Sequence, residues 1–329
     1  MKPNPISPTV ELDKSGVQHG YLRLPYSRDD SAWGSIAIPV TVIANGDGPT
    51  ALLTGANHGD EYEGPVALMD LALNLKAEQV SGRVIIVPMM NYPAFLAGKR
   101  TSPIDSGNMN RLFPGNPGGT VTQKIADYFQ RTLLPMADYV LDIHSGGRTL
   151  DFIPFAAAHV LADKAQQGRC VAAMEAFNAP YSMMLMEIDA VGMYDTAAEE
   201  MGKVFVSTEL GGGGTATVRS AEIAKQGVWN LLAHAGIVSA TTQRRESVNL
   251  DMPDGRCYVT SESAGLVEPC AALGEPVREG DVLMRVYDVH HTGKAPAEYR
   301  AKIDGILAGR HFPGLIGHGD FVAVVAVPV

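Results

Sequence analysis

Apolar runs that suit buried strands alternate with segments of helical periodicity over the first 245 residues, and this alternation constrains the fold more than any other feature. Strands are expected at 35–45, 50–54, 83–88, 138–143 and 203–208, and helices at 64–77, 120–136 and 218–236. Strands joined through helices pair in parallel. The chain is therefore predicted to form an α/β domain around a mostly parallel sheet.

The pattern changes from residue 250 onward to short strands punctuated by glycine and proline, without a helical period. We therefore expect an α/β domain at 1–245 and a small all-β domain at 246–329. Two stretches of the second domain echo each other, as in modules that carry biotin or lipoate. The lysines between them, Lys294 and Lys302, lack the flanking residues of such carriers. A purely structural role is predicted for this domain.

The charge balance excludes whole classes of partner. The 26 basic and 36 acidic residues give a net charge of −10 without any basic run, so nucleic-acid binding is not expected. Every apolar run is broken well short of the roughly 20 residues that a membrane span requires. The first residues lack the pattern of a secretory signal, so a cytoplasmic location is expected. A small-molecule partner is predicted, and a homo-oligomer stays open.

His58 and Glu61 lie in GANHGDEYEG, directly after one apolar strand and before a helix. Ligands of parallel α/β sheets bind at the carboxyl ends of the strands. A histidine and a glutamate three residues apart at such a turn can face one point, and zinc accepts both as ligands. Taken alone, the pair equally suits a polar helix start, with Glu61 near the positive end of the helix dipole.

His144, in YVLDIHSGG, again lies at the carboxyl end of an apolar strand. Together with His58 and Glu61 it gives two imidazoles and one carboxylate, the ligand set of hydrolytic zinc sites. We therefore predict one Zn²⁺ per chain. Asp142 is on the same strand face as His144, so it can accept the spare N–H of a ligand imidazole. The alternatives are a core histidine for His144 and a strand-end cap for Asp142.

Glu209, in VFVSTELGGGG, is delivered by another strand to the same edge of the sheet. A hydrolase that activates water needs a base, which takes up the proton and later passes it to the leaving amine. We predict this role for Glu209, and the alternative is that it merely opens a flexible glycine loop.

Arg100, Asn110 and Arg111 lie on a long segment between these strands, where neither helix nor strand is expected. Because an arginine fork matches a carboxylate in two hydrogen bonds, these residues are predicted to bind a substrate carboxylate. Ordinary surface charges are the alternative.

The four motifs GANHGDEYEG, GNMNRLFPG, DIHSGG and STELGGGG, in this order, resemble the aspartoacylase and succinylglutamate desuccinylase family, a branch of the zinc carboxypeptidase superfamily. The resemblance covers about residues 35–240. It implies a mixed, mostly parallel sheet flanked by helices, with a smaller C-terminal all-β domain. It also implies a zinc-dependent amidohydrolase that removes an acyl group from a small N-acylated amino acid. The site residues that carry over are the metal ligands His58, Glu61 and His144, the catalytic Glu209, and the pair Asn110 and Arg111.

The substrate implied within this family is N-acetyl-L-2,4-diaminobutyrate, and N-acetylaspartate or N-succinylglutamate are the alternatives. The segment 187–200 is acidic, so Glu187, Asp189 or Asp195 could bind a substrate ammonium if the segment borders the site. Otherwise it is a solvated surface stretch.

Two other classes compete with the hydrolase interpretation. GGGGTA at 211–216 fits a dinucleotide-binding pattern, but no acid follows at the required distance of about 20 residues. A non-catalytic binding module with a vestigial metal site is disfavoured by the intact set of ligands together with Glu209.

Overall fold

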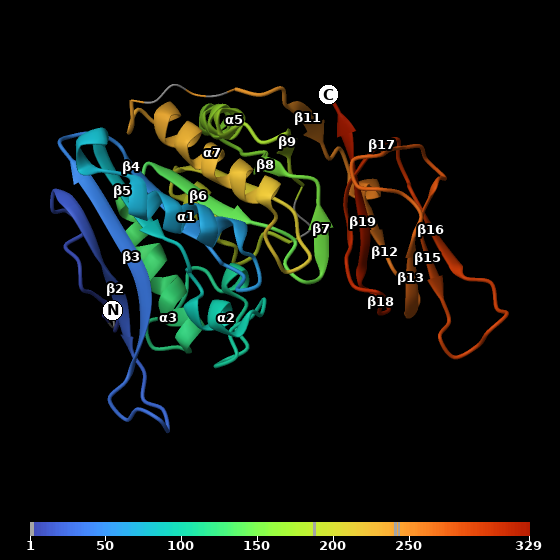
Figure 1. The fold of residues 1–329 in the computed structure, drawn as a ribbon, viewed down its shortest axis with the longest axis horizontal. Coiled ribbons are helices and arrows are strands. Elements are labelled where there is room, and N and C mark those ends of the chain that lie inside the picture. The colour runs from blue at the N-terminus through green and yellow to red at the C-terminus, as the bar shows by residue number, and fades with distance from the viewer. Residues whose placement is uncertain (1–2, 187–188, 240–241, 243) are drawn as a thin grey trace.

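The computed structural model describes residues 3–186, 189–239, 242 and 244–329. Figure 1 shows a layered α/β part, formed by the earlier three quarters of the chain, and a smaller β part beside it. The predicted fold class is confirmed, because a large mixed sheet with flanking helices is accompanied by a separate antiparallel sheet at the C-terminal end.

Most of the strands belong to one mixed sheet of 15 strands, in the order β1-β2-β3-β5-β4-β6-β10-β8-β9-β11-β19-β17-β14, with β12 on β19 and β7 on β17. Its strands are β1 (Ser7–Pro8), β2 (Gly16–Pro25), β3 (Ser35–Asn45), β4 (Thr50–Gly55), β5 (Gly82–Val87), β6 (Tyr139–His144), β7 (Leu150–Phe152), β8 (Phe155–Ala158), β9 (Tyr181–Met184), β10 (Val204–Glu209), β11 (Val248–Asp251), β12 (Tyr258–Thr260), β14 (Pro276–Val277), β17 (Gly305–His311) and β19 (Phe321–Pro328). The smaller sheet contains β13 (Gly265–Pro269), β15 (Val282–Tyr287), β16 (Ala297–Arg300) and β18 (Leu315–Ile316).

The central strands β5, β4, β6 and β10 are parallel neighbours. The α-helices are α1 (Glu63–Asn74), α2 (Tyr92–Ala97), α3 (Val121–Tyr128), α4 (Leu134–Met136), α5 (Lys164–Phe177), α6 (Tyr194–Glu200) and α7 (Val218–His234). Short turns of other helix types are η1 (Ala77–Gln79), η2 (Met109–Arg111), the π-helical η3 (Phe129–Leu133) and η4 (Gly255–Cys257). Because β5, β4, β6 and β10 run parallel, their carboxyl ends meet at one edge of the sheet, where ligands are expected.

Helices cover both faces of the central sheet, which explains its unbroken apolar strands. Leu52 and Leu53 are consecutive in β4 and both are fully buried, yet they belong to different hydrophobic cores. Leu53 packs with residues of α1, α5 and α7, and Leu52 with residues of α3 and α6. A strand buried on both faces loses the apolar and polar alternation of a half-exposed strand.

The larger sheet continues into the C-terminal part of the chain. β11 pairs in parallel with β9 and in antiparallel with β19. β7 also pairs with β17. These ladders cross the predicted division at residues 245 and 246, which stays a prediction. The two stretches that echo each other form the antiparallel pairs β13–β15 and β17–β19, but in different sheets.

None of the helices in the described ranges is long and apolar enough to cross a membrane.

Candidate active site

Three side chains that the sequence placed at strand ends lie together at the carboxyl edge of the sheet. His58 and Glu61 come from the loop between β4 and α1, and His144 is the last residue of β6. Their ligand atoms all lie within 4.8 Å of one another, and all three residues are buried. Two imidazoles and a carboxylate facing one point could hold a metal ion, and zinc favours this donor set.

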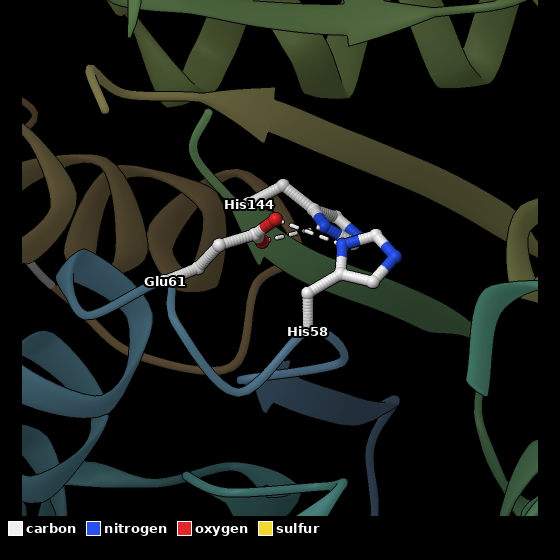
Figure 2. Close-up of side chains that lie close together, drawn as sticks. All are labelled: His58, Glu61 and His144. Atoms are coloured by element: carbon white, nitrogen blue, oxygen red, sulfur yellow. Dashed lines mark hydrogen bonds and ion pairs between the residues drawn. The ribbon is translucent and has the colours of Figure 1, made fainter. Parts of the chain in front are cut away.

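The carboxylate of Glu61 faces both imidazoles, as Figure 2 shows. His58 Nδ1 is 2.8 Å from Oε1 of Glu61, and His144 Nδ1 is 2.8 Å from Oε2. Although burial opposes charge on the carboxylate, the two imidazoles lower the pKa of Glu61 well below its usual value. Glu61 is therefore ionised and available as an anionic ligand.

Asp142 fixes the orientation of His144. Its Oδ2 lies 2.7 Å from Nε2 of His144 and also accepts a hydrogen bond of 2.9 Å from the amide of Asn57. Its Oδ1 accepts a bond of 2.7 Å from the hydroxyl of Thr54. Burial alone would lower the pKa of His144, but Asp142 and Glu61 outweigh it and raise that pKa well above its usual value.

This arrangement fits a cation. When Nε2 of a neutral His144 donates to Asp142, Nδ1 presents a lone pair to the carboxylate of Glu61, only 2.8 Å away. Two acceptors at that distance repel each other unless a proton or a metal ion lies with them. The burial of His58 lowers the pKa of its imidazole, which favours the neutral form that binds metals.

The loop that carries His58 and Glu61 is held by contacts that sequence reasoning missed. Asp60 Oδ2 accepts a hydrogen bond of 2.8 Å from the backbone N–H of Arg148, which joins this loop to the one that follows His144. A Cβ at Gly59 would lie 2.0 Å from the backbone of Ala94, so only glycine allows α2 to approach so closely. Asp60 lies inside the sequence motif, but nothing in the motif indicated its partner.

Glu209 lies beside His144 because β10 and β6 are parallel and pair these two residues in register. Side chains that are paired in this way project from the same face of a sheet. Burial, reinforced by the negative charge of Glu61, raises the pKa of Glu209 to about 8. Its Oε2 is buried and has no hydrogen-bond partner among the described residues. A buried carboxyl group with an unused oxygen beside a metal site is suited to proton transfer.

The structure separates the two arginines. Nη1 of Arg100 lies 3.7 Å from Oε1 of Glu61, so this guanidinium is next to the ligand cluster. Arg111 lies instead in the wall of a neighbouring cavity. Asn110 and Arg111 belong to the short turn η2, although neither helix nor strand was expected there. Asn110 uses its Oδ1 to accept a hydrogen bond of 2.9 Å from the backbone N–H of Tyr194.

The cavity beside Glu209 has a volume of about 470 Å³, and both parts of the chain line it. Among the described residues, Arg111, Asp189 and Glu209 are the charged ones in its lining. The α/β part adds apolar side chains, and the C-terminal part contributes Met252, Tyr258, Phe321 and Val324. The C-terminal part therefore contributes to the wall of this cavity, and its purely structural role stays a prediction. The sequence could not reveal this contribution, because these residues reach the site only when β11, β12 and β19 pair.

The glycine-rich segment after β10 is packed against protein. A Cβ at Gly212 would lie 1.9 Å from the carbonyl oxygen of Leu150, and one at Gly213 would lie 2.7 Å from the ring of Phe312. At the start of α7, Thr217 Oγ1 accepts a hydrogen bond of 3.0 Å from the N–H of Ser220. Close packing therefore explains the glycines, and the chain itself caps the helix that a dinucleotide phosphate would need.

Two described residues of the acidic segment 187–200, Asp189 and Met193, line the cavity. Asp189 is exposed and lines the cavity. Asp195 is buried in the first turn of α6, where its carboxylate accepts a hydrogen bond from the backbone N–H of Thr196. Glu187 lies outside the described residues. Of the two described acids considered for an ammonium, Asp189 is the one in the wall.

Comparisons with known proteins agree with this geometry. Residues 47–235 match the family model of the succinylglutamate desuccinylase/aspartoacylase catalytic domain. The chain is 58% identical over 327 residues to the N-alpha-acetyl-L-2,4-diaminobutyric acid deacetylase of Halomonas elongata. The matched stretch covers 99% of this chain and 96% of that relative.

Two solved structures are also closely similar. The product-bound ectoine utilization protein EutE (DoeB) of Ruegeria pomeroyi is 66% identical, with a TM-score of 0.98 over 99% of this chain and 100% of that chain. A structure named as a succinylglutamate desuccinylase from Silicibacter sp. TM1040 is also 66% identical, with a TM-score of 0.97 and complete coverage of both chains.

Proposed function

Since the chain belongs to the succinylglutamate desuccinylase/aspartoacylase family, whose members are deacylases, we propose that it is a zinc-dependent deacetylase of N-α-acetyl-L-2,4-diaminobutyrate. The observation that carries the proposal is the convergence of His58, Glu61 and His144 beside Glu209. The substrate rests on the likeness to the Halomonas elongata enzyme over nearly the whole chain.

His58, Glu61 and His144 would hold the zinc ion through two nitrogens and one oxygen. In such a site zinc supplies Lewis-acid polarisation of the amide carbonyl and activation of a water. Asp142 keeps His144 in the tautomer that presents Nδ1 to the ligand cluster. Beside a bound cation, Glu209 would be held in its ionised form, which burial otherwise opposes.

Glu209 takes the proton from the attacking water and passes it to the leaving nitrogen as the amide C–N bond breaks. The products are acetate and 2,4-diaminobutyrate. Because Arg100 lies beside the ligand cluster, its guanidinium stabilises negative charge that develops on the acyl oxygen. Arg111 lies in the cavity wall and binds the substrate carboxylate.

Side-by-side kinetics with zinc analysis test the proposal. We expect one zinc per chain, and a kcat/KM for N-α-acetyl-L-2,4-diaminobutyrate at least roughly a hundred-fold above those for N-acetylaspartate and N-succinylglutamate. The N-succinylglutamate arm is needed because a structural relative with 66% identity is named as a succinylglutamate desuccinylase. A preference for either dicarboxylate would overturn the substrate and leave the zinc chemistry intact.

A further inference from the structure

The cavity beside Glu209 has an unusual charge pattern for a wall that is otherwise mostly apolar. Arg111 and Asp189 contribute opposite charges to its lining. Within the described part of the chain, Asp189 forms no ion pair, and its Oδ1 accepts a hydrogen bond of 3.0 Å from the backbone N–H of Val191. The carboxylate of Asp189 is therefore exposed at the cavity and open to a cationic group of a ligand.

The residues around Asp189 are tied to the site on both sides. On the N-terminal side, the hydroxyl of Tyr258 donates a hydrogen bond of 2.6 Å to the carbonyl oxygen of Met186. On the C-terminal side, the N–H of Phe113 donates a bond of 3.0 Å to the carbonyl oxygen of Gly192. The C-terminal part and the turn with Arg111 thus anchor the chain on either side of Asp189.

Gly192 shows how closely these segments approach. Its φ of +74° lies in the left-handed region, and a Cβ there would lie 2.6 Å from the carbonyl oxygen of Arg111. The backbone of Gly192 therefore contacts the residue that supplies the positive charge of the cavity. Two residues further along the chain, the N–H of Tyr194 donates a hydrogen bond to Oδ1 of Asn110 and holds the same two segments together. Arg111 and Asp189 are consequently presented to one cavity by two segments that are bonded together.

We propose that Asp189 binds the side-chain ammonium of the substrate while Arg111 binds its carboxylate, which makes Asp189 the residue that selects a basic side chain. The inference rests on the proposed function and adds the determinant of its selectivity. An amino acid that carries a carboxylate and an ammonium two methylenes away matches a wall that offers Arg111 to the carboxylate and Asp189 to the ammonium, with Glu209 reserved for proton transfer. A side-chain carboxylate would instead meet the like charge of Asp189.

The test compares two substrates that differ only in the ammonium. The zinc-loaded wild type and the Asp189→Asn variant are assayed with N-α-acetyl-L-2,4-diaminobutyrate and with N-acetyl-L-2-aminobutyrate, whose side chain is an uncharged ethyl group. Asp189→Asn should lower kcat/KM for the basic substrate by about tenfold, as expected for loss of a charge-assisted contact. Its efficiency with the neutral substrate should change by no more than about twofold.

Glu200→Gln is the matched control, because Glu200 is an exposed acid at the end of α6 outside the cavity lining. It should leave both efficiencies within about twofold of the wild type. Asp189→Lys supplies a gain-of-function arm, since it should raise the efficiency with N-acetylaspartate relative to the basic substrate.

The other outcomes would overturn either the role of Asp189 or the proposed deacetylase function. An equal loss with both substrates would show that Asp189 supports the loop only, and no loss with either would show that it does not touch the substrate. Both results overturn this inference and leave the deacetylase function standing. Absence of acetate release from both compounds by the zinc-loaded wild type overturns the proposed function, and the inference with it.

Discussion

The two walls of the site are built in different ways. On one side, His144 and Glu209 end neighbouring parallel strands, and backbone pairing in register places them side by side. On the other side, Tyr258 of β12 and Phe321 of β19, with Met252 just after β11, reach the cavity from far along the chain. The first wall is made of titratable groups at strand ends, among which His144 contacts both Glu61 and Asp142, and the second is mainly apolar surface.

This difference indicates a division of labour. In the first wall each buried charge depends on its neighbours, so the loss of one leaves the others uncompensated. In the second wall each apolar contact contributes on its own and mainly shapes the space for the substrate. Substitutions at the strand ends are therefore expected to remove turnover, and substitutions in the C-terminal wall to change substrate affinity.

The largest effect is expected from the ligand cluster. His58→Ala removes one of three ligands, so both bound zinc and turnover should fall to background. Metal analysis and an acetate-release assay measure the two quantities. His318→Ala, which alters an exposed histidine of the C-terminal part, should keep both. Full zinc and full turnover in the His58 variant would remove this residue from the site.

The next effect concerns proton transfer. Glu209→Gln should retain zinc and substrate binding but lower kcat by roughly 10²–10⁴-fold, because general acid–base groups typically contribute this much. Glu222→Gln makes the same change at an exposed position of α7 and should be silent. Retention of more than roughly a tenth of wild-type kcat would assign the proton transfer to another group.

Arg111 is expected to have an intermediate effect, because it lies in the α/β part but faces the cavity. Arg111→Ala should reduce kcat/KM by about ten- to a hundred-fold, the worth of a charge-assisted contact. The variant should also lose the discrimination of the wild type between the free acid and its methyl ester. Arg23→Ala on β2 is the control for lost positive charge. Equal efficiency of the wild type on acid and ester would exclude carboxylate binding.

The smallest effect tests the C-terminal wall. Tyr258→Phe removes the hydrogen bond to the carbonyl oxygen of Met186, whose net contribution should be about 1 kcal/mol. KM should rise a few-fold while kcat stays near that of the wild type. A collapse of kcat instead would show that the C-terminal wall takes part in the chemistry.

The same comparison explains what the sequence could predict. The proximity of His58, Glu61, His144 and Glu209 could be predicted because each follows an apolar run, and the ends of parallel strands converge by geometry alone. The unbroken apolar run of β4 also predicted a buried strand, and the structure buries it on both faces. Information of this kind is local and can be read from neighbouring residues.

The C-terminal contribution could not be predicted in this way. Tyr258 and Phe321 carry no local signal for a cavity, and their position depends on the pairing of β12 with β19. The partition of the two arginines was equally hidden, because Arg100 and Arg111 lie on one irregular segment. Their distances from Glu61 and from the cavity follow only from the folded backbone.

The continuous sheet also limits how the two parts of the chain can evolve. A chain that stopped at residue 245 would lack β11 and β19 and would leave β9 as an unprotected edge. Its unpaired N–H and C=O groups would invite pairing with other molecules, the usual start of aggregation. We therefore do not expect the C-terminal part to be gained or exchanged as a separate domain at residue 245. We expect the two parts to have diverged together.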